Sequence, residues 1–427
     1  MKEKFKKFKD SAFAKQAYKV YTKMIYLVRW IVIALIVGTV VGGFATLFAK
    51  SMNFVTEFRM ENAWIILLMP LVGIVIVASY KLAHNDNDRG TNLVISSISS
   101  GEDVPLRMAP LIFISTVLTH LVGGSAGREG AALQLGGSLG NYLSKLFRID
   151  EKDKRIIIMC GMSAAFSALF GTPLAATIFA LEVVSVGIMH YSALVPCIIS
   201  SLMASGFAMD MGIKPDKFKV IDIPEFTALT GFQTIVLAIG CAAVSMLFCV
   251  AMHKVSALLK KMVKNAYIRV VVVSIVLIVA GFILQTTDYY GAGVHVIERA
   301  IEGEVFIAAF VIKILFTSLT LGAGFKGGEI IPSFFVGATF GCLMGQLIGL
   351  SPSLCAAMGM AAVFCGVTNC PIASLLIGFE LFGDEVKLYL ILSVAISYMM
   401  SGYYGLYSDQ KIMYSKSKTE FINTHAK

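Results

Sequence analysis

The chain has 427 residues, of which 57% are hydrophobic and 15% are charged, and its formal net charge is +9 at pH 7. Soluble domains carry roughly 25% charged residues, so this composition excludes an ordinary soluble protein and predicts one polytopic membrane domain. No basic patch interleaved with aromatic residues argues for a nucleic-acid partner.

The first segment, residues 1–25, is rich in lysine and precedes an apolar run that is too long for a signal peptide and lacks a small-residue cleavage site. We expect residues 1–25 to form a basic amphipathic arm. The connector near 254–269 and the tail 411–427 are also rich in Lys and Arg. The positive-inside rule therefore places these segments, and both termini, on the cytoplasmic side of the cell membrane.

Several of the apolar runs approach the ~20 residues that cross a bilayer. Others are shorter or are cut by Gly and Pro, which is typical of helices that stop partway through the membrane and line a protected cavity. We predict an all-α polytopic membrane protein built from broken transmembrane helices. The runs lie near residues 26–50, 63–83, 108–123, 156–181, 191–212, 231–253, 268–285, 305–320 and 387–404.

Two pairs of segments repeat along the chain. "GREGAALQLGGSLG" from Gly127 aligns with "GGEIIPSFFVGATFG" from Gly327, and "GMSAAFSALFGTPLAATIFALE" from Gly161 aligns with "GMAAVFCGVTNCPIASLLIGFE" from Gly359. Because two separate blocks align at nearly the same offset, the similarity is not a chance match.

The alignment predicts two homologous membrane repeats, 26–215 and 228–410, joined by a linker at 216–227. Transporters built from repeats bind substrate where the repeats meet, with helix N-termini aimed at an anion. An odd number of helices in each repeat would invert one repeat relative to the other, and a parallel arrangement stays open.

Charged residues interrupt the first glycine-rich motif, where Arg128 and Glu129 lie between Gly127 and Gly130. Close helix packing would explain the glycines but not these charges, and the second repeat carries Glu329 at the equivalent place. A carboxylate in the membrane is costly unless it is protonated, paired or facing water. An ion pair with Arg128 is one alternative, although adjacent helical residues point about 100° apart. Otherwise Glu129 occupies an anion-binding helix N-terminus as a gate and proton carrier.

The eight cysteines and six histidines show no paired CxxC spacing and no metal-ligand pattern. We interpret the cysteines as small core residues and expect neither a metal nor a cofactor. No nucleophile with its base, metal triad or phosphate loop indicates an enzyme.

Together these motifs resemble the signatures of the CLC family of anion channels and anion/proton antiporters. "GREGAALQLGG" is similar to the family's GREGP, "FGTPLAATIFALE" to its PLAG…FxxEE segment, "GGEIIPSFFVGA" to GxFxP, and "YYGLYSDQKI" to the stretch that holds its anion-coordinating tyrosine. The resemblance covers nearly the whole chain in order. It implies a homodimer in the lipid bilayer with one pore per subunit, formed by two inverted repeats, that moves halide anions and protons without enzymatic catalysis.

The resemblance also implies roles for single residues. Glu129 matches the gating glutamate and Tyr407 the central tyrosine, while Thr91 stands near the family's anion-facing serine. Taken alone, Tyr407 with its neighbours Tyr403 and Tyr404 would indicate an interfacial aromatic belt. The candidate anion-binding residues are Gly127, Arg128, Gly130, Thr91, Ile331 and Tyr407.

Departures from the family pattern bear on the substrate. Ala131, Asn92 and Leu93 replace a proline and two glycines, and Val183 stands where many proton-coupled members have a second glutamate after the position of Glu182. Val183 resembles the channel-type members, which keeps open a chloride channel or a chloride/proton antiporter. The hydroxyl donors of Thr91 and Tyr407 also favour that alternative.

Glu329 favours another branch. A glutamate in the GxFxP motif resembles the fluoride-exporting (CLC-F) members, which also lack the inner glutamate that Val183 replaces. That branch tends to have threonine where Ile331 stands and often methionine near Thr91, so the match is incomplete. We expect a fluoride/proton antiporter in which Glu129 and Glu329 carry gating and protons. Pairing of Glu329 with Lys326 is the structural alternative.

Glu182 and Glu380 end apolar helices at equivalent places in the two repeats. We expect them to satisfy backbone groups at a helix end rather than to take part in transport. The sequence beyond Tyr407 contains no cytoplasmic nucleotide-binding domain, so no response to nucleotide of that kind is expected.

Overall fold

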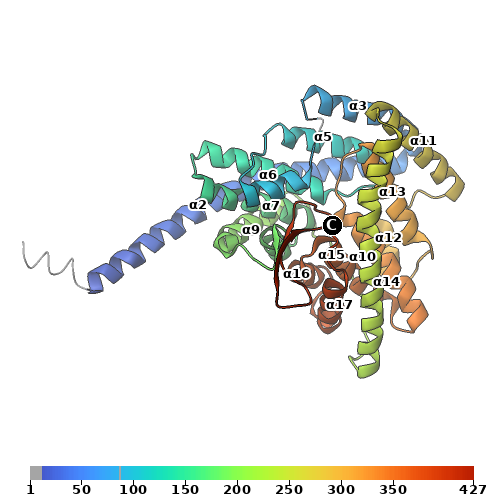
Figure 1. Ribbon diagram of the computed structural model, residues 1–427. Helices are drawn as coiled ribbons and strands as arrows, with labels where there is room; N and C mark the ends of the chain where they lie inside the picture. The colour runs from blue at the N-terminus through green and yellow to red at the C-terminus, as the bar shows by residue number, and fades with distance from the viewer. Residues whose placement is uncertain (1–11, 86–87) are drawn as a thin grey trace, which may run out of the picture.

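A computed structural model describes residues 12–85 and 88–427 of the protein, and these are predominantly helical (Figure 1). Before the predicted linker at 216–227 the chain forms α2 (Ala12–Glu61), η1 (Ala63–Leu68), α3 (Met69–Leu82), α4 (Thr91–Ser100), α5 (Met108–Leu121), α6 (Glu129–Leu146), α7 (Glu151–Phe170), α8 (Pro173–Glu182), η2 (Tyr191–Ala193) and α9 (Leu194–Asp210). After it the chain forms α10 (Ala228–Met262), α11 (Ala266–Leu284), α12 (Val294–Ile301), α13 (Ala309–Ala323), α14 (Ile330–Ile348), α15 (Pro352–Thr368), α16 (Pro371–Phe382), η3 (Asp384–Val386) and α17 (Lys387–Met400). This helical architecture confirms the predicted polytopic fold.

Six of the described helices are long and apolar enough to cross a membrane. Five shorter apolar helices of 10–17 residues, among them α8 and α16, fall below the ~20 residues that cross a bilayer, as predicted for broken helices. Residues 1–11 of the expected arm lie outside the described part of the chain. From Ala12 the arm continues without a break into the first span, so α2 projects beyond the body of the molecule as one long helix (Figure 1).

Equivalent glycines lie at the centre of each repeat. Gly136 of α6 faces Gly161 of α7, and Gly337 of α14 faces Gly359 of α15. A Cβ on any of the four would clash with the backbone carbonyl of the glycine opposite. Glycine therefore lets these helix pairs approach backbone to backbone, and close packing explains these glycines in both repeats.

Two glutamates join the repeats reciprocally at the ends of α8 and α16. The Glu182 carboxylate accepts the N–H groups of Ile372 (3.2 Å) and Ala373 (2.9 Å) at the start of α16. The Glu380 carboxylate accepts those of Leu174 (3.0 Å) and Ala175 (2.9 Å) at the start of α8. This exchange confirms the predicted structural role, because each carboxylate satisfies free N–H groups at a helix N-terminus.

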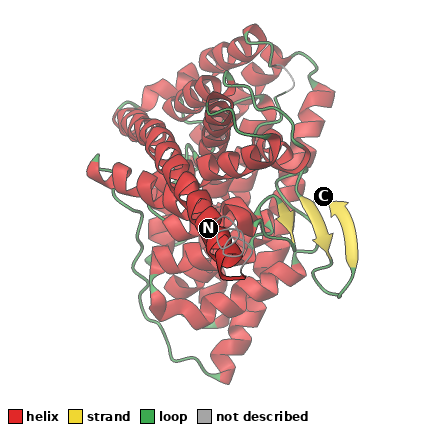
Figure 2. Ribbon diagram, turned by 90° about the vertical axis from the view of Figure 1, so that its left-hand side faces the viewer, coloured by secondary structure: helices red, strands yellow, loops and turns green. Residues whose placement is uncertain are grey.

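A small sheet accompanies the helices. The tail forms β2 (Lys411–Tyr414) and β3 (Phe421–His425), which pair antiparallel, and β2 also pairs parallel with β1 (Ser185–Val186) of the first repeat. Figure 2 shows this sheet at one edge of the helical body. The tail thus packs on the end of α8 instead of trailing away.

All eight cysteines are buried and unpaired with one another by disulfides, which confirms their interpretation as core residues. Among the described residues, no group of three or more His, Cys, Asp or Glu side chains could hold a metal ion.

Candidate anion and proton site

The glycine-rich loops of the two repeats pair with each other in front of two helices. The Gly127 N–H donates to the Gly328 carbonyl and the Gly328 N–H to the Gly127 carbonyl, both at 2.7 Å, in an antiparallel bridge. Glu129 begins α6 and Ile330 begins α14, each two positions after the glycine of its own loop. The bridge therefore holds two helix N-termini, one from each repeat, at one point in the interior.

Glu129 fills the space between these helix N-termini. Its side chain is fully buried, and its Oε2 accepts the N–H groups of Arg128 (3.0 Å) and Ile331 (3.4 Å). Its Oε1 has no hydrogen-bond partner among the described residues. One carboxylate oxygen thus binds N–H groups from both repeats, the kind of site that helix N-termini offer to an anion.

Arg128 forms a long ion pair with Glu129, which the sequence predicted to be geometrically awkward. Arg128 is the residue before α6, so its side chain is not bound to the helical 100° spacing, and its Nε lies 3.6 Å from Glu129 Oε1. The guanidinium continues outward, donates to Asn53 Oδ1 (3.1 Å) and lies 3.6 Å from Asp216 Oδ2. Arg128 therefore steadies the motif mainly by anchoring it to other segments.

Glu329 lies directly before α14, close to the start of α6. A Cβ placed on Gly130 would lie 3.3 Å from Glu329 Oε2. Unlike Glu129, Glu329 is only partly buried and lines a cavity. Lys326 pairs with Asp88 at 2.6 Å, and no ion pair joins Lys326 to Glu329 in the described part of the chain.

The cavity that Glu329 reaches has a volume of about 470 Å³. Thr91 and Tyr407 line it from opposite repeats, as does Gln134 of α6. The Thr91 hydroxyl donates to the Gly130 carbonyl (3.3 Å) and accepts from Gln134 Nε2 (3.3 Å). Basic side chains line the same cavity, namely Arg89, Lys260 and Lys326.

Tyr407 is buried, and its hydroxyl has no hydrogen-bond partner among the described residues. A buried donor without a partner is costly, so this hydroxyl is available to an anion in the cavity. The aromatic-belt alternative does not hold for Tyr407, which faces the protein interior instead of the bilayer interface.

Gln134 is a site residue that the sequence interpretation missed. It lies within "AALQLGG", five positions after Glu129. Its Oε1 also lacks a hydrogen-bond partner within residues 12–85 and 88–427. A polar side chain in this apolar run was the available signal.

A family model described as "Voltage gated chloride channel" matches residues 75–402. The chain belongs to the CLC family. This CLC protein is 33% identical over 398 residues to a protein of Pseudomonas syringae pv. tomato named "Chloride/fluoride channel protein", covering 92% of this chain and 88% of that one. It is 24% identical over 401 residues to a Vibrio parahaemolyticus protein named "H(+)/Cl(-) exchange transporter ClcA", with coverage of 86% and 84%.

Solved structures agree with the family. The crystal structure of a CLC-type fluoride/proton antiporter superposes with a TM-score of 0.87 at 31% identity and covers 90% of this chain and 98% of that one. A slow cyanobacterial Cl⁻/H⁺ antiporter superposes with a TM-score of 0.77 at 19% identity, with coverage of 87% and 94%, and shows the shared fold alone. This CLC protein is thus a multi-pass membrane protein with the fold predicted from its repeats.

Proposed function

We propose that this CLC protein exchanges fluoride for protons. The observation that carries the proposal is that both N–H donors at the gate converge on one atom, Oε2 of Glu129. A monatomic anion that replaces this oxygen must fit between the same two donors. Fluoride is close in size to a carboxylate oxygen, whereas chloride is larger and would spread the two helix N-termini.

In the proposed cycle the anion and the Glu129 carboxylate compete for the N–H groups of Arg128 and Ile331. A proton that neutralises Glu129 weakens its hold on these donors, because a neutral carboxyl accepts more weakly than a carboxylate. Glu329, which lines the cavity beside Gly130, receives the proton from the cavity side. Anion movement and proton movement are therefore linked through two carboxylates at equivalent places.

The cavity supports an orientation for the protein. Lys260, which belongs to the basic stretch at the end of α10, lines it. By the positive-inside rule that stretch faces the cytoplasm, so we place the cavity, Glu329 and both termini on the cytoplasmic side. We further propose inverted repeats and a homodimer with one pore per subunit.

A chloride channel or chloride/proton antiporter is the second candidate. The Thr91 and Tyr407 hydroxyls favour it, since both line the cavity as donors, and the Vibrio relatives carry names of that kind.

The test uses purified protein in liposomes, with paired fluoride and chloride efflux recorded beside a pH electrode. We expect fluoride efflux to exceed chloride efflux and to drive protons in the opposite direction. Glu129→Gln and Glu329→Gln should each remove proton movement, while Glu385→Gln, at an exposed position outside the site, should behave as wild type. Equal passage of both halides would refute the proposal and favour the chloride candidate.

A further inference from the structure

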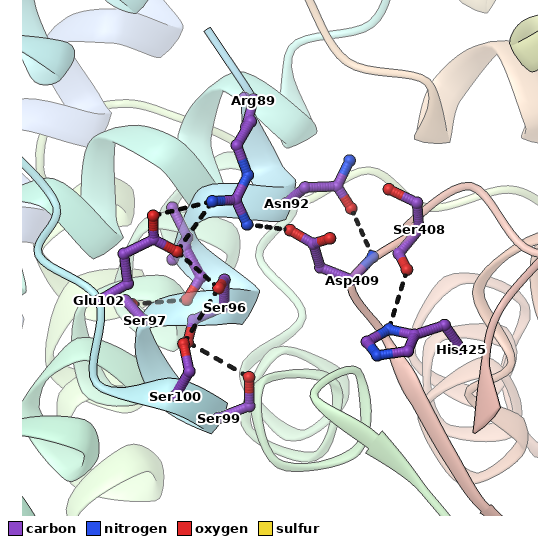
Figure 3. Close-up of polar contacts among 12 residues, drawn as sticks. Arg89, Asn92, Ser96, Ser97, Ser99, Ser100, Glu102, Ser408, Asp409 and His425 are labelled. Atoms are coloured by element: carbon purple, nitrogen blue, oxygen red, sulfur yellow. Dashed lines mark hydrogen bonds and ion pairs between the residues drawn. The ribbon is translucent and has the colours of Figure 1, made fainter. Parts of the chain in front are cut away.

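Three chain segments meet at the edge of the cavity, and Arg89 joins them. Its guanidinium donates to both carboxylate oxygens of Glu102, each at 2.8 Å, and also to the Asp409 carboxylate (Figure 3). Glu102 follows α4, whereas Asp409 lies on the loop that carries Tyr407. Arg89, which itself lines the cavity, is thus bound to a loop 320 positions further along the chain.

A second contact joins the start of α4 to the loop that carries Tyr407. The Asp409 N–H donates to the Asn92 side-chain oxygen at 3.1 Å (Figure 3). Asn92 is adjacent to Thr91, and Asp409 is two residues beyond Tyr407. The two cavity-facing hydroxyls are therefore borne by the start of α4 and by the Tyr407 loop, which are bound to each other through Asp409.

The Tyr407 loop is fixed on its other side. The Leu406 N–H donates to the Val367 carbonyl (2.9 Å), and Gln410 Nε2 donates to the carbonyls of Val183 (2.9 Å) and Thr368 (2.8 Å). His425 of β3 contacts the Ser408 carbonyl at 3.2 Å. These anchors hold the loop to the end of α8, to α15 and to β3, so separation of the two cavity walls requires the contacts of Asp409 to break.

The ionic contacts of Asp409 are suited to opening. The side chains of Arg89 and Asp409 are 42% and 27% exposed, and partly exposed ion pairs contribute little to stability. Glu102 holds Arg89 in place, since hydrogen bonds from Ser96 and Arg89 lower the pKa of Glu102 and keep it ionised. Arg89 therefore stays oriented toward Asp409 whether or not that pair is closed.

We propose that Arg89 and Asp409 form a latch across the cavity that sets how far Thr91 and Tyr407 separate, and with it the size of anion that passes between them. The latch rests on the proposed halide transport, and it makes Arg89 and Asp409 positioning residues for selection between fluoride and chloride. Its opening would admit the larger halide.

Arg89→Gln and Asp409→Asn test the latch by the ratio of chloride to fluoride efflux from liposomes. Each should raise that ratio about two- to fivefold, the range expected for one partly exposed ion pair, and the double variant should raise it no further than either single one. Arg29→Gln, which removes a similarly exposed arginine from its ion pair with Asp153, is the matched control and should leave the ratio unchanged.

A merely electrostatic role predicts a different pattern. Arg89→Gln removes positive charge from the cavity and Asp409→Asn removes negative charge, so through the field alone their effects on anion flux would be opposite and additive. That result, or an unchanged ratio in both variants, overturns the latch. If a neutral variant fails to give monodisperse protein, Arg89→Lys and Asp409→Glu keep the charges while changing the reach, and should give smaller increases of the ratio.

The wild-type protein alone tests the proposed function, separately from the latch variants. If wild-type protein passes chloride as readily as fluoride, the fluoride assignment falls. The latch then still predicts faster chloride efflux in both single variants without a further gain in the double variant, and additive rates would overturn it.

Discussion

The reciprocal glutamates offer a test of what holds the two repeats together. Glu182 is 6% exposed and accepts two N–H groups at the start of α16. Glu182→Ala leaves both groups without an acceptor inside the protein. Hydrogen bonds to a charged group contribute about 1.5–3 kcal/mol each, so the two bonds together stabilise the protein by about 3–6 kcal/mol.

For a chain of this length that loss should lower the melting temperature by about 3–7 °C. Heating the detergent-solubilised protein and following its monodisperse peak by size exclusion measures the shift. Glu380→Ala should lower the melting temperature by less, because Glu380 is only partly buried. Water can then hydrate the N–H groups of Leu174 and Ala175 that lose their acceptor. Glu385→Ala, at an exposed position, is the control. A Glu182→Ala protein that melts within about 1 °C of wild type would refute the reasoning.

Further predictions concern the site and the core. Gly328→Ala should abolish halide efflux, because its Cβ would lie 2.5 Å from the Gly130 nitrogen. Gly206→Ala is the control and should keep wild-type efflux, since among the described residues no atom outside the adjacent turns of its own helix lies within 4 Å of its Cβ. Equal efflux by the two variants would contradict the prediction. Tyr407→Phe should keep the melting temperature, yet slow fluoride efflux about fivefold through one lost hydrogen bond; a lowered melting temperature would show a structural role instead. The eight buried cysteines should resist maleimide until detergent denatures the protein, and labelling of the folded protein would refute their burial.

Much of the fold was predictable because the evidence for it is repeated along the chain. The motif at Glu129 recurs at Glu329, and the apolar helix that ends at Glu182 recurs in the one that ends at Glu380. Two independent copies distinguish a structural requirement from a local accident. The same repetition predicted that Glu129 and Glu329 belong to one site, and the helix N-termini of α6 and α14 do meet there.

Contacts between distant segments were not predictable, since periodicity reports only on neighbours in sequence. The bond from the Ile331 N–H to Glu129 and the pair of Arg89 with Asp409 join residues 202 and 320 positions apart. The sequence did not predict the strands of the tail, for a related reason. β1 contributes only Ser185 and Val186, too few residues to show an alternating pattern, and the sheet forms only because the tail returns to them.

The position of Val183 explains why the proposed proton route runs through Glu329. The Val183 side chain is fully buried, and its carbonyl accepts from Gln410, so the end of α8 is covered by the Tyr407 loop. The titratable side chain at this end of α8, Glu182, is engaged by the N–H groups of Ile372 and Ala373, and position 183 itself offers no carboxylate to exchange protons with water. Glu329, in contrast, lines the cavity and lies over the start of α6. A carboxylate that meets water on one side and the gate on the other can supply the step that a glutamate at position 183 would otherwise supply. Glu329→Gln should therefore stop proton movement even though Glu129 is intact.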